Sequence, residues 1–163
     1  MDQSRIDALA AAPVAAQGLW IGGKSVAAAS GAVMGVTSPI DGRPLTTIAD
    51  AGPQDVAAAV ASARRAYDNG VWSRAAPAHR KAVLHRIADA IEREALALAV
   101  LGVRDNGTEI SMAIKAEPGS AAATFRYYAE ALDKVYGEIA PTQGNVLAMI
   151  HREPVGVVGA IVP

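Results

Sequence analysis

The stretch HREPVGVVGAIVP, residues 151–163, decides the fold class of this chain. From Val155 to Val162 every residue is apolar or glycine, and no polar residue alternates with them. An uninterrupted apolar run of this length is typical of a parallel strand that is covered on both faces. The stretch therefore predicts an α/β protein in which residues 154–163 form a buried strand. Because such a strand pairs with neighbours that this sequence does not encode, we expect the chain to be a truncated part of a larger fold.

Upstream of this stretch, apolar residues recur at helical spacing in three segments. The first is residues 53–69, which open with a proline and are followed by a glycine, as helices often are. The second is residues 76–107, where we expect a break near Glu94. The third is residues 120–137, which end at a glycine. These three segments are predicted to be helices.

Short apolar runs between turn residues predict the strands. Residues 19–26 contain two such runs separated by two glycines, which predicts a β-hairpin. A short strand is expected over residues 45–49, and an exposed strand over residues 146–153. The alanine-rich residues 1–17 are predicted to be a loose or weakly helical lead.

Residues 18–25, GLWIGGKS, match the spacing of a phosphate-binding P-loop ending in Lys24 and a serine. That loop needs a buried strand before it and small residues where its backbone wraps the phosphate. Here a poor strand precedes the motif, and the loop would contain the bulky Leu19, Trp20 and Ile21. The sequence therefore favours a hairpin over a nucleotide site.

The composition excludes several classes of function. Fifteen basic and 16 acidic residues give a net charge of −1, which provides no field to attract nucleic acid or an anionic membrane. No segment reaches the length of apolar sequence that spans a membrane, and the N-terminus lacks the basic start of a signal peptide. We therefore expect a cytoplasmic enzyme or part of one. The chain has no cysteine, which excludes a disulfide, a thiolate metal site and a cysteine nucleophile.

The residues themselves reveal no catalytic machinery. His79 and His85 are six positions apart, so they do not share a helix face as metal ligands at i and i+4 would. No spacing indicates a catalytic triad or a pair of catalytic carboxylates. The GVVG within the final stretch also differs from the dinucleotide fingerprint G-x-G-x-x-G.

Six stretches of the sequence are similar to the N-terminal portion of the aldehyde dehydrogenase superfamily. They are LWIGGKSV (19–26), TSPIDGRPLTTI (37–48), DVAAAVASARRAY (55–67), RDNGTEI (104–110), FRYYAEALDKVYGE (125–138) and HREPVGVVGAIVP (151–163). The resemblance covers about residues 18–163. Ser38 stands where the family usually has asparagine, and Thr108 where it usually has lysine. Within the superfamily, the chain most resembles the γ-glutamyl-γ-aminobutyraldehyde dehydrogenases of polyamine catabolism.

The resemblance implies a fragment of the α/β aldehyde dehydrogenase fold: a β-hairpin, a helical segment, an oligomerisation strand and the first strand of an incomplete Rossmann-like sheet. It implies a homo-oligomer in the full-length enzyme. The implied divisions are a flexible lead (1–17), the hairpin and helices of the cofactor-binding domain (18–140), an oligomerisation-arm strand (141–153) and the truncated first strand of the NAD-binding sheet (154–163).

The resemblance also implies NAD(P)+-dependent oxidation of an aldehyde, with an aminoaldehyde as the expected substrate. In this family a cysteine thiolate attacks the aldehyde carbonyl, donors in an oxyanion hole stabilise the adduct, and a glutamate activates the hydrolytic water. The family's cysteine, oxyanion asparagine and general-base glutamate all match positions beyond Pro163. The chain alone is therefore expected to contain no catalytic residue and to be inactive.

Other family sites fall within the chain. Ile161, Val162 and Pro163 match positions beside the nicotinamide ribose of NAD or NADP, although strand core would explain them equally. Asp105 and the backbone carbonyl of Val36 match a site that often holds a monovalent cation, although an aspartate there is also an ordinary helix-end residue. We expect little cofactor binding by this part alone.

Glu117 lies just before the third predicted helix and Ser120 lies at its start, and this helix resembles the one that flanks the family's substrate tunnel. A carboxylate at Glu117 could attract the amino group of an aminoaldehyde, and a solvated loop residue is the other interpretation. The alternative function for the whole chain is a non-catalytic oligomerisation or partner-binding module derived from the family.

Overall fold

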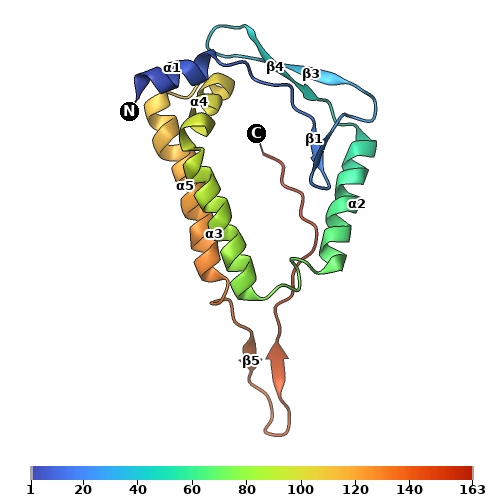
Figure 1. The fold of residues 1–163 in the computed structure, drawn as a ribbon. Helices are drawn as coiled ribbons and strands as arrows, with labels where there is room; N and C mark the ends of the chain where they lie inside the picture. The colour runs from blue at the N-terminus through green and yellow to red at the C-terminus, as the bar shows by residue number, and fades with distance from the viewer. Residues whose placement is uncertain (1, 163) are drawn as a thin grey trace.

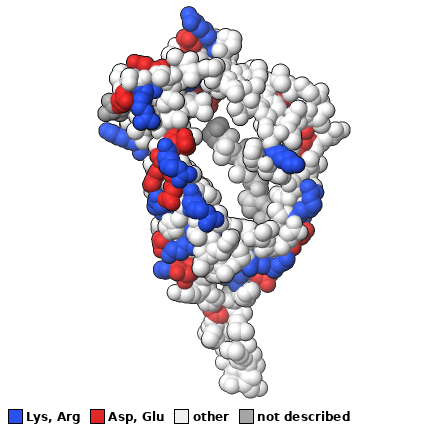
Figure 2. Space-filling model, viewed as in Figure 1, with Lys and Arg blue, Asp and Glu red and all other residues white. Residues whose placement is uncertain are grey.

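A computed structural model describes residues 2–162, which form five helices and three two-stranded sheets. The helices are α1 (Gln3–Ala11), α2 (Pro53–Asn69), α3 (Pro77–Arg93), α4 (Ala95–Asn106) and α5 (Ile110–Ala131). The helices α3 and α5 lie side by side on one flank, and α2 lies opposite them (Figure 1). The C-terminal segment runs between the two flanks, and the space-filling view shows hollows beside it (Figures 1 and 2); we call this region the open interior.

Each of the three sheets is a pair of antiparallel strands. The pairs are β1 (Leu19–Ile21) with β2 (Lys24–Val26), β3 (Val33–Thr37) with β4 (Pro44–Ala49), and β5 (Glu138–Ala140) with β6 (Ala148–Ile150). The turn of the first hairpin holds Gly22 and Gly23 at φ 62° and 77°, where only glycine is free of strain. The predicted hairpin over residues 19–26 and the strand over residues 45–49 are confirmed.

Two of the predicted helical segments are also confirmed. Helix α2 begins at Pro53, and its C-cap Gly70 adopts the left-handed conformation. The expected break near Glu94 separates α3 from α4, because the backbone of this residue leaves the helical region at φ −96° and ψ 9°. Gly107 then ends α4 in the left-handed conformation.

The third helix differs from its prediction at both ends. Helix α5 begins at Ile110 rather than at residue 120, and it ends at Ala131 rather than near residue 137. The early start places Pro118 inside the helix, where proline removes a backbone hydrogen bond. This proline is buried, and α5 packs along both α3 and α4. Packing of the surrounding turns therefore overrides the local preference for a break.

Within the lead that was predicted to be loose or weakly helical, residues 3–11 form α1. The Asp2 carboxylate accepts a hydrogen bond from the Ser4 amide at 3.1 Å and caps α1. The side chain of Ile6 is buried, and the Arg104 guanidinium donates to the carbonyl of Ala12 at 2.7 Å. These contacts dock α1 onto α4, which sequence periodicity alone did not indicate.

The largest correction concerns residues 154–162, which form no strand in the described structure. Val155 is 92% exposed and Ile161 is 101% exposed, whereas the sequence predicted a strand buried on both faces. A strand is defined by the ladder it shares with a neighbour, and no other segment of residues 2–162 pairs with these residues. The predicted strand over 146–153 is likewise shorter, since β6 covers only Ala148–Ile150.

The described core is small and rich in alanine. Five alanines at the contacts of α3, α4 and α5 are almost completely buried: Ala88, Ala99, Ala113, Ala122 and Ala129. Small side chains allow the helix backbones to approach closely, which explains why these three helices form the packed flank of the molecule. Across residues 2–162, no helix has both the length and the apolar character needed to cross a membrane.

Candidate functional site

The structure brings Val36 and Asp105 to one depression of about 560 Å³. Strands β3 and β4 form one wall, and α4 forms the other. The residue Gln17 closes one side, because its backbone pairs with the neighbouring strand: its amide donates to Thr47 O at 3.0 Å, and its carbonyl accepts from Ala49 N at 2.8 Å. Segments far apart in the sequence therefore meet here.

The lining of this depression is mainly apolar, and its polar residues are Gln17, Thr46 and Asp105. A carboxylate and a hydroxyl are oxygen ligands of the kind that hard cations prefer. Within residues 2–162 no cluster of three or more histidine, aspartate or glutamate side chains could hold a metal ion. A monovalent cation at Val36 and Asp105 stays a prediction.

Glu117 and Ser120 both lie well inside α5, so the predicted position of these residues at the start of the helix is wrong. The Glu117 carboxylate points toward α4, where its Oε1 accepts from Asn106 Nδ2 at 3.3 Å. A Cβ added at Gly102 would lie only 2.5 Å from Oε2 of Glu117, which shows how closely the carboxylate approaches that helix. Ser120 is exposed. The sequence did not identify Asn106 as the partner, because the contact depends on how α4 and α5 pack.

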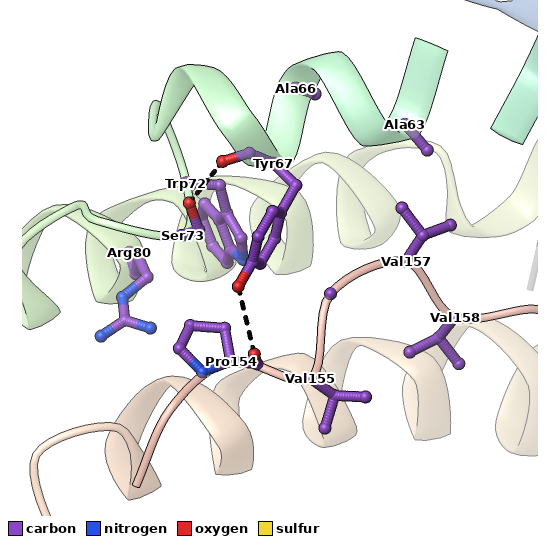
Figure 3. A pocket seen from close by; sticks show the side chains of 11 residues that line it. Ala63, Ala66, Tyr67, Trp72, Ser73, Arg80, Pro154, Val155, Val157 and Val158 are labelled. Carbon is purple, nitrogen blue, oxygen red and sulfur yellow. Dashed lines mark hydrogen bonds between the residues drawn. The ribbon is translucent and has the colours of Figure 1, made fainter. Parts of the chain in front are cut away.

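The segment after β6 crosses between the two flanks and forms a second depression, of about 470 Å³ (Figure 3). One side of this depression comes from the end of α2 and the turn after it, and the other from the segment itself. Its lining residues are Ala63, Ala66, Tyr67, Trp72, Ser73, Arg80 and residues 154–158. In the sequence, Tyr67 was notable only as a residue of the predicted helix over residues 53–69.

Polar contacts organise this second depression. The hydroxyl of Tyr67 donates to the carbonyl of Pro154 at 3.3 Å, and Ser73 Oγ donates to the carbonyl of Tyr67 at 2.7 Å (Figure 3). The guanidinium of Arg64 lies 4.9 Å from the centre of the Tyr67 ring, a cation–π contact. The Nε of Arg80 is buried without a hydrogen-bond partner among the described residues.

The flank formed by α3 and α5 carries basic and acidic side chains close together rather than a patch of one sign (Figure 2). Lys81 Nζ lies 2.5 Å from Oε2 of Glu130, and His85 Nε2 lies 2.9 Å from Oε1. The hydrogen bond from Lys81, followed by that from His85, lowers the pKa of Glu130 below its ordinary value. Arg126 bridges α5 to Asp89 and Glu92 of α3 in the same way. These contacts tie α3 to α5, and nothing about them indicates catalysis.

The residues predicted to touch the cofactor lie at the open end of the segment. Ile161 and Val162 are 101% and 78% exposed, and Pro163 lies outside the described residues. Neither of the two exposed residues lines the depressions described above. Ile161 and Val162 offer apolar side chains and backbone groups, but no depression described above encloses them. Residues 2–162 by themselves therefore do not fit a dinucleotide at this place.

The sequence model of the aldehyde dehydrogenase family matches residues 26–163. Among curated relatives, the NADP/NAD-dependent aldehyde dehydrogenase PuuC of Escherichia coli is 44% identical over 89% of this chain and 29% of its own length. The aminoacetaldehyde dehydrogenase of Pseudomonas aeruginosa is 40% identical over 83% of this chain and 27% of its own length. The chain therefore spans under a third of the length of these relatives.

Solved structures give the same likeness. One is the indole-3-acetaldehyde dehydrogenase AldA of P. syringae in complex with NAD+, with a TM-score of 0.89 and 38% sequence identity. The match covers 96% of this chain and 32% of the AldA chain. Another is the γ-glutamyl-γ-aminobutyraldehyde dehydrogenase of Burkholderia cenocepacia, with a TM-score of 0.83 and 39% sequence identity. The match covers 88% of this chain and 29% of the chain of that enzyme.

Proposed function

Because the chain belongs to the aldehyde dehydrogenase family, we propose that it is the N-terminal part of an NAD(P)+-dependent enzyme that oxidises an aldehyde to a carboxylate. The observation that carries this proposal is the likeness to a solved dehydrogenase over 96% of the chain at 38% identity. A match of this extent involves the helices, the hairpins and the C-terminal segment together. It is therefore stronger support than any single motif.

In this proposal the chain supplies structure rather than reacting groups. The family chemistry needs a thiolate to add to the aldehyde carbonyl, and the bound NAD(P)+ then accepts the hydride. Since the sequence contains no cysteine, these 163 residues alone do not form the covalent adduct. The contribution of the chain is then to hold the segment that leads toward the cofactor, to bind a cation near Asp105, and to present the hairpin of β5 and β6 to another subunit.

The test is a chimera in which residues 1–163 replace the matching N-terminal part of the E. coli relative. We expect the purified chimera to reduce NAD+ or NADP+ when an aldehyde is added, and we expect the isolated chain to produce no reduced cofactor. A folded chimera that is inactive with every aldehyde that its parent oxidises would contradict the proposal. Activity of the isolated chain would contradict the assignment of a structural role.

For the substrate we propose an aminoaldehyde, supported by two of the relatives, an aminoacetaldehyde dehydrogenase and a γ-glutamyl-γ-aminobutyraldehyde dehydrogenase. Attraction of the amino group was one of two interpretations of Glu117, and in the structure its carboxylate accepts a hydrogen bond from Asn106. In the chimera, Glu117→Gln would raise the KM for an aminoaldehyde more than the KM for a neutral aldehyde of equal length if the carboxylate binds the amino group. Equal KM changes for both substrates would leave Glu117 with a role in helix packing only.

The protruding hairpin supports a second candidate, a non-catalytic module that binds a dehydrogenase subunit. Ile139 and Met149 on the hairpin are 73% and 71% exposed, and exposed strand edges pair readily with other strands. Figure 2 shows that the tip of the hairpin carries no charge on this face. If this module is the function, the chain will co-purify with a full-length relative while the chimera stays inactive. Sequencing the coding DNA beyond the codon for Pro163 separates the two candidates as well.

A further inference from the structure

A single hydrogen bond fixes the C-terminal segment to the described part of the chain. The Tyr67 hydroxyl at the end of α2 donates to the Pro154 carbonyl at 3.3 Å, although the two residues are 87 positions apart. Within residues 2–162, no other hydrogen bond joins residues 154–162 to another element. The Tyr67 hydroxyl is therefore the one hydrogen-bonding group among residues 2–153 that contacts this segment.

The ring that carries this hydroxyl is itself held in place. The guanidinium of Arg64 lies 4.9 Å from the ring centre, and Arg64 Nε lies 3.1 Å from Oδ1 of Asp68 one turn further along α2. The ring lines the same depression as Trp72, and its hydroxyl is aimed at Pro154 (Figure 3). An aromatic ring with few rotamers, packed in this way, presents its donor in one position at little entropic cost.

The backbone turns immediately after the tether. Gly156 has φ 109°, a conformation that other residues rarely adopt, so the turn depends on glycine at this position. A Cβ at Gly156 would lie 3.7 Å from a terminal nitrogen of Arg64, so the turn stays within reach of the same cluster on α2. Beyond this turn the segment runs into the open interior (Figure 1).

Helix α3 borders the same point from the other side. Arg80 and Pro154 both line the depression beside α2 and a neighbouring depression beside α5. The segment therefore passes between the two flanks at Pro154, with the Tyr67 hydroxyl on one side and Arg80, a half-buried arginine with a buried Nε, on the other.

From this geometry we propose that Tyr67 is a positioning residue, whose hydroxyl holds Pro154 and so sets the path of residues 155–162 through the interior. Its importance for cofactor binding rests on the proposed function, because Ile161 and Val162 lie on this segment. The tether itself does not depend on that function. It acts through the backbone of Pro154 and contacts no reacting group.

The test uses the absence of cysteine from the sequence, which allows one introduced thiol to be labelled uniquely. Val158 and Trp72 line the same depression. A bimane label on Val158→Cys is therefore placed close enough for the indole of Trp72 to quench its fluorescence on contact. The same labelled variant with Trp72→Phe shows how much of the quenching comes from that indole. We expect Tyr67→Phe to increase the ratio of unquenched to quenched label roughly two- to tenfold, the effect of losing one neutral hydrogen bond.

Two controls separate the hydroxyl from the ring. Tyr128→Phe removes the hydroxyl of an exposed tyrosine on α5 and should leave the quenching unchanged. Tyr67→Ala removes ring and hydroxyl together. If the ring alone positioned the segment, Tyr67→Phe would keep the quenching of the parent while Tyr67→Ala lost it, and the proposal would be overturned. Circular dichroism and the melting temperature should stay the same in Tyr67→Phe, since its ring packing is retained. Enzyme activity does not enter this experiment, so failure of the proposed function would leave its result readable.

Discussion

Gly137 lies directly against the carbonyl of Ile150 at the base of the hairpin formed by β5 and β6. A Cβ built on Gly137 would approach the Ile150 oxygen to 2.5 Å, closer than real side chains come to backbone. The adjacent pair in the ladder is Glu138 with Ile150. The sequence pattern predicted that this glycine ends a helix. In the structure it lets the two backbone segments of the hairpin approach each other closely at its base.

We therefore predict that Gly137→Ala opens the base of the hairpin. The added methyl group cannot be accommodated by a side-chain shift, because the atom it meets is backbone, and overpacking of this kind costs about 1–3 kcal/mol. Hydrogen exchange of the backbone amides in β5 and β6 should accelerate. Gly144→Ala in the loop of the same hairpin is the matched control, since nothing lies within 4 Å of its Cβ position. Equal exchange in both variants would argue against the close contact.

Asp55 is predicted to stabilise the junction between the strands and α2. The residue is 7% exposed, and its carboxylate accepts from the Gly52 amide and from the Ala29 amide, each at 2.9 Å. Replacing it with alanine leaves two backbone donors without a partner and should lower the free energy of unfolding by about 2–3 kcal/mol in urea titrations. Asp55→Asn, which keeps one oxygen, should have a smaller effect. Asp50→Ala, at an exposed position, should have almost none.

The contact between α3 and α5 is predicted to weaken in acid. The folded-state pKa of Glu130 is lowered, first by the hydrogen bond from Lys81 and then by that from His85. A carboxyl group with a lowered pKa adds stability above its unfolded pKa, near 4.5, and loses it as the pH falls through the folded value. The melting temperature of Glu130→Gln should therefore fall less than that of the parent as the pH drops below about 4.5. Lys81→Gln, which removes the largest cause, should bring the titration of Glu130 back toward its ordinary range.

The exposed C-terminal segment is predicted to cause self-association. Val155 and Val158 are 92% and 73% exposed, and apolar segments with unpaired backbone groups pair with one another. The double variant Val155→Asp and Val158→Asp should reduce light scattering at high protein concentration without lowering the melting temperature. Val71→Asp changes an equally exposed valine outside the segment and should leave the scattering as it is in the parent. A parent chain that stays monomeric at every concentration would count against this prediction.

The sequence predicted those elements whose signals are local. Helix α2 begins at Pro53 and ends before Gly70. Proline favours the first helical turn and glycine the left-handed cap, both through their own backbone conformation, so these boundaries could be predicted without knowledge of any contact. The break at Glu94 and the two-glycine turn of the first hairpin were predictable for the same reason. The resemblance to a family placed Val36 and Asp105 in one site, and the structure lines one depression with both.

Other features depend on groups that meet only when the chain is folded. The helical start of α5 at Ile110 survives Pro118 because that residue is buried in the packed flank, and α1 is docked by Arg104, more than 90 positions away in the sequence. The engagement of Glu117 with Asn106 likewise follows from the packing of α4 against α5. None of these partners is visible in a window of neighbouring residues.

Residues 151–163 show most clearly the difference between what the sequence determines and what the tertiary structure decides. Their sequence determined that residues 155–162 are apolar, uncharged and suited to a sheet interior. Only the tertiary structure decided that they run unpaired through the interior, tethered at Pro154 by the hydroxyl of Tyr67. The physical reason is that apolar character belongs to each residue separately, whereas a β-ladder exists only between two strands, and residues 2–162 bring no second strand beside this one.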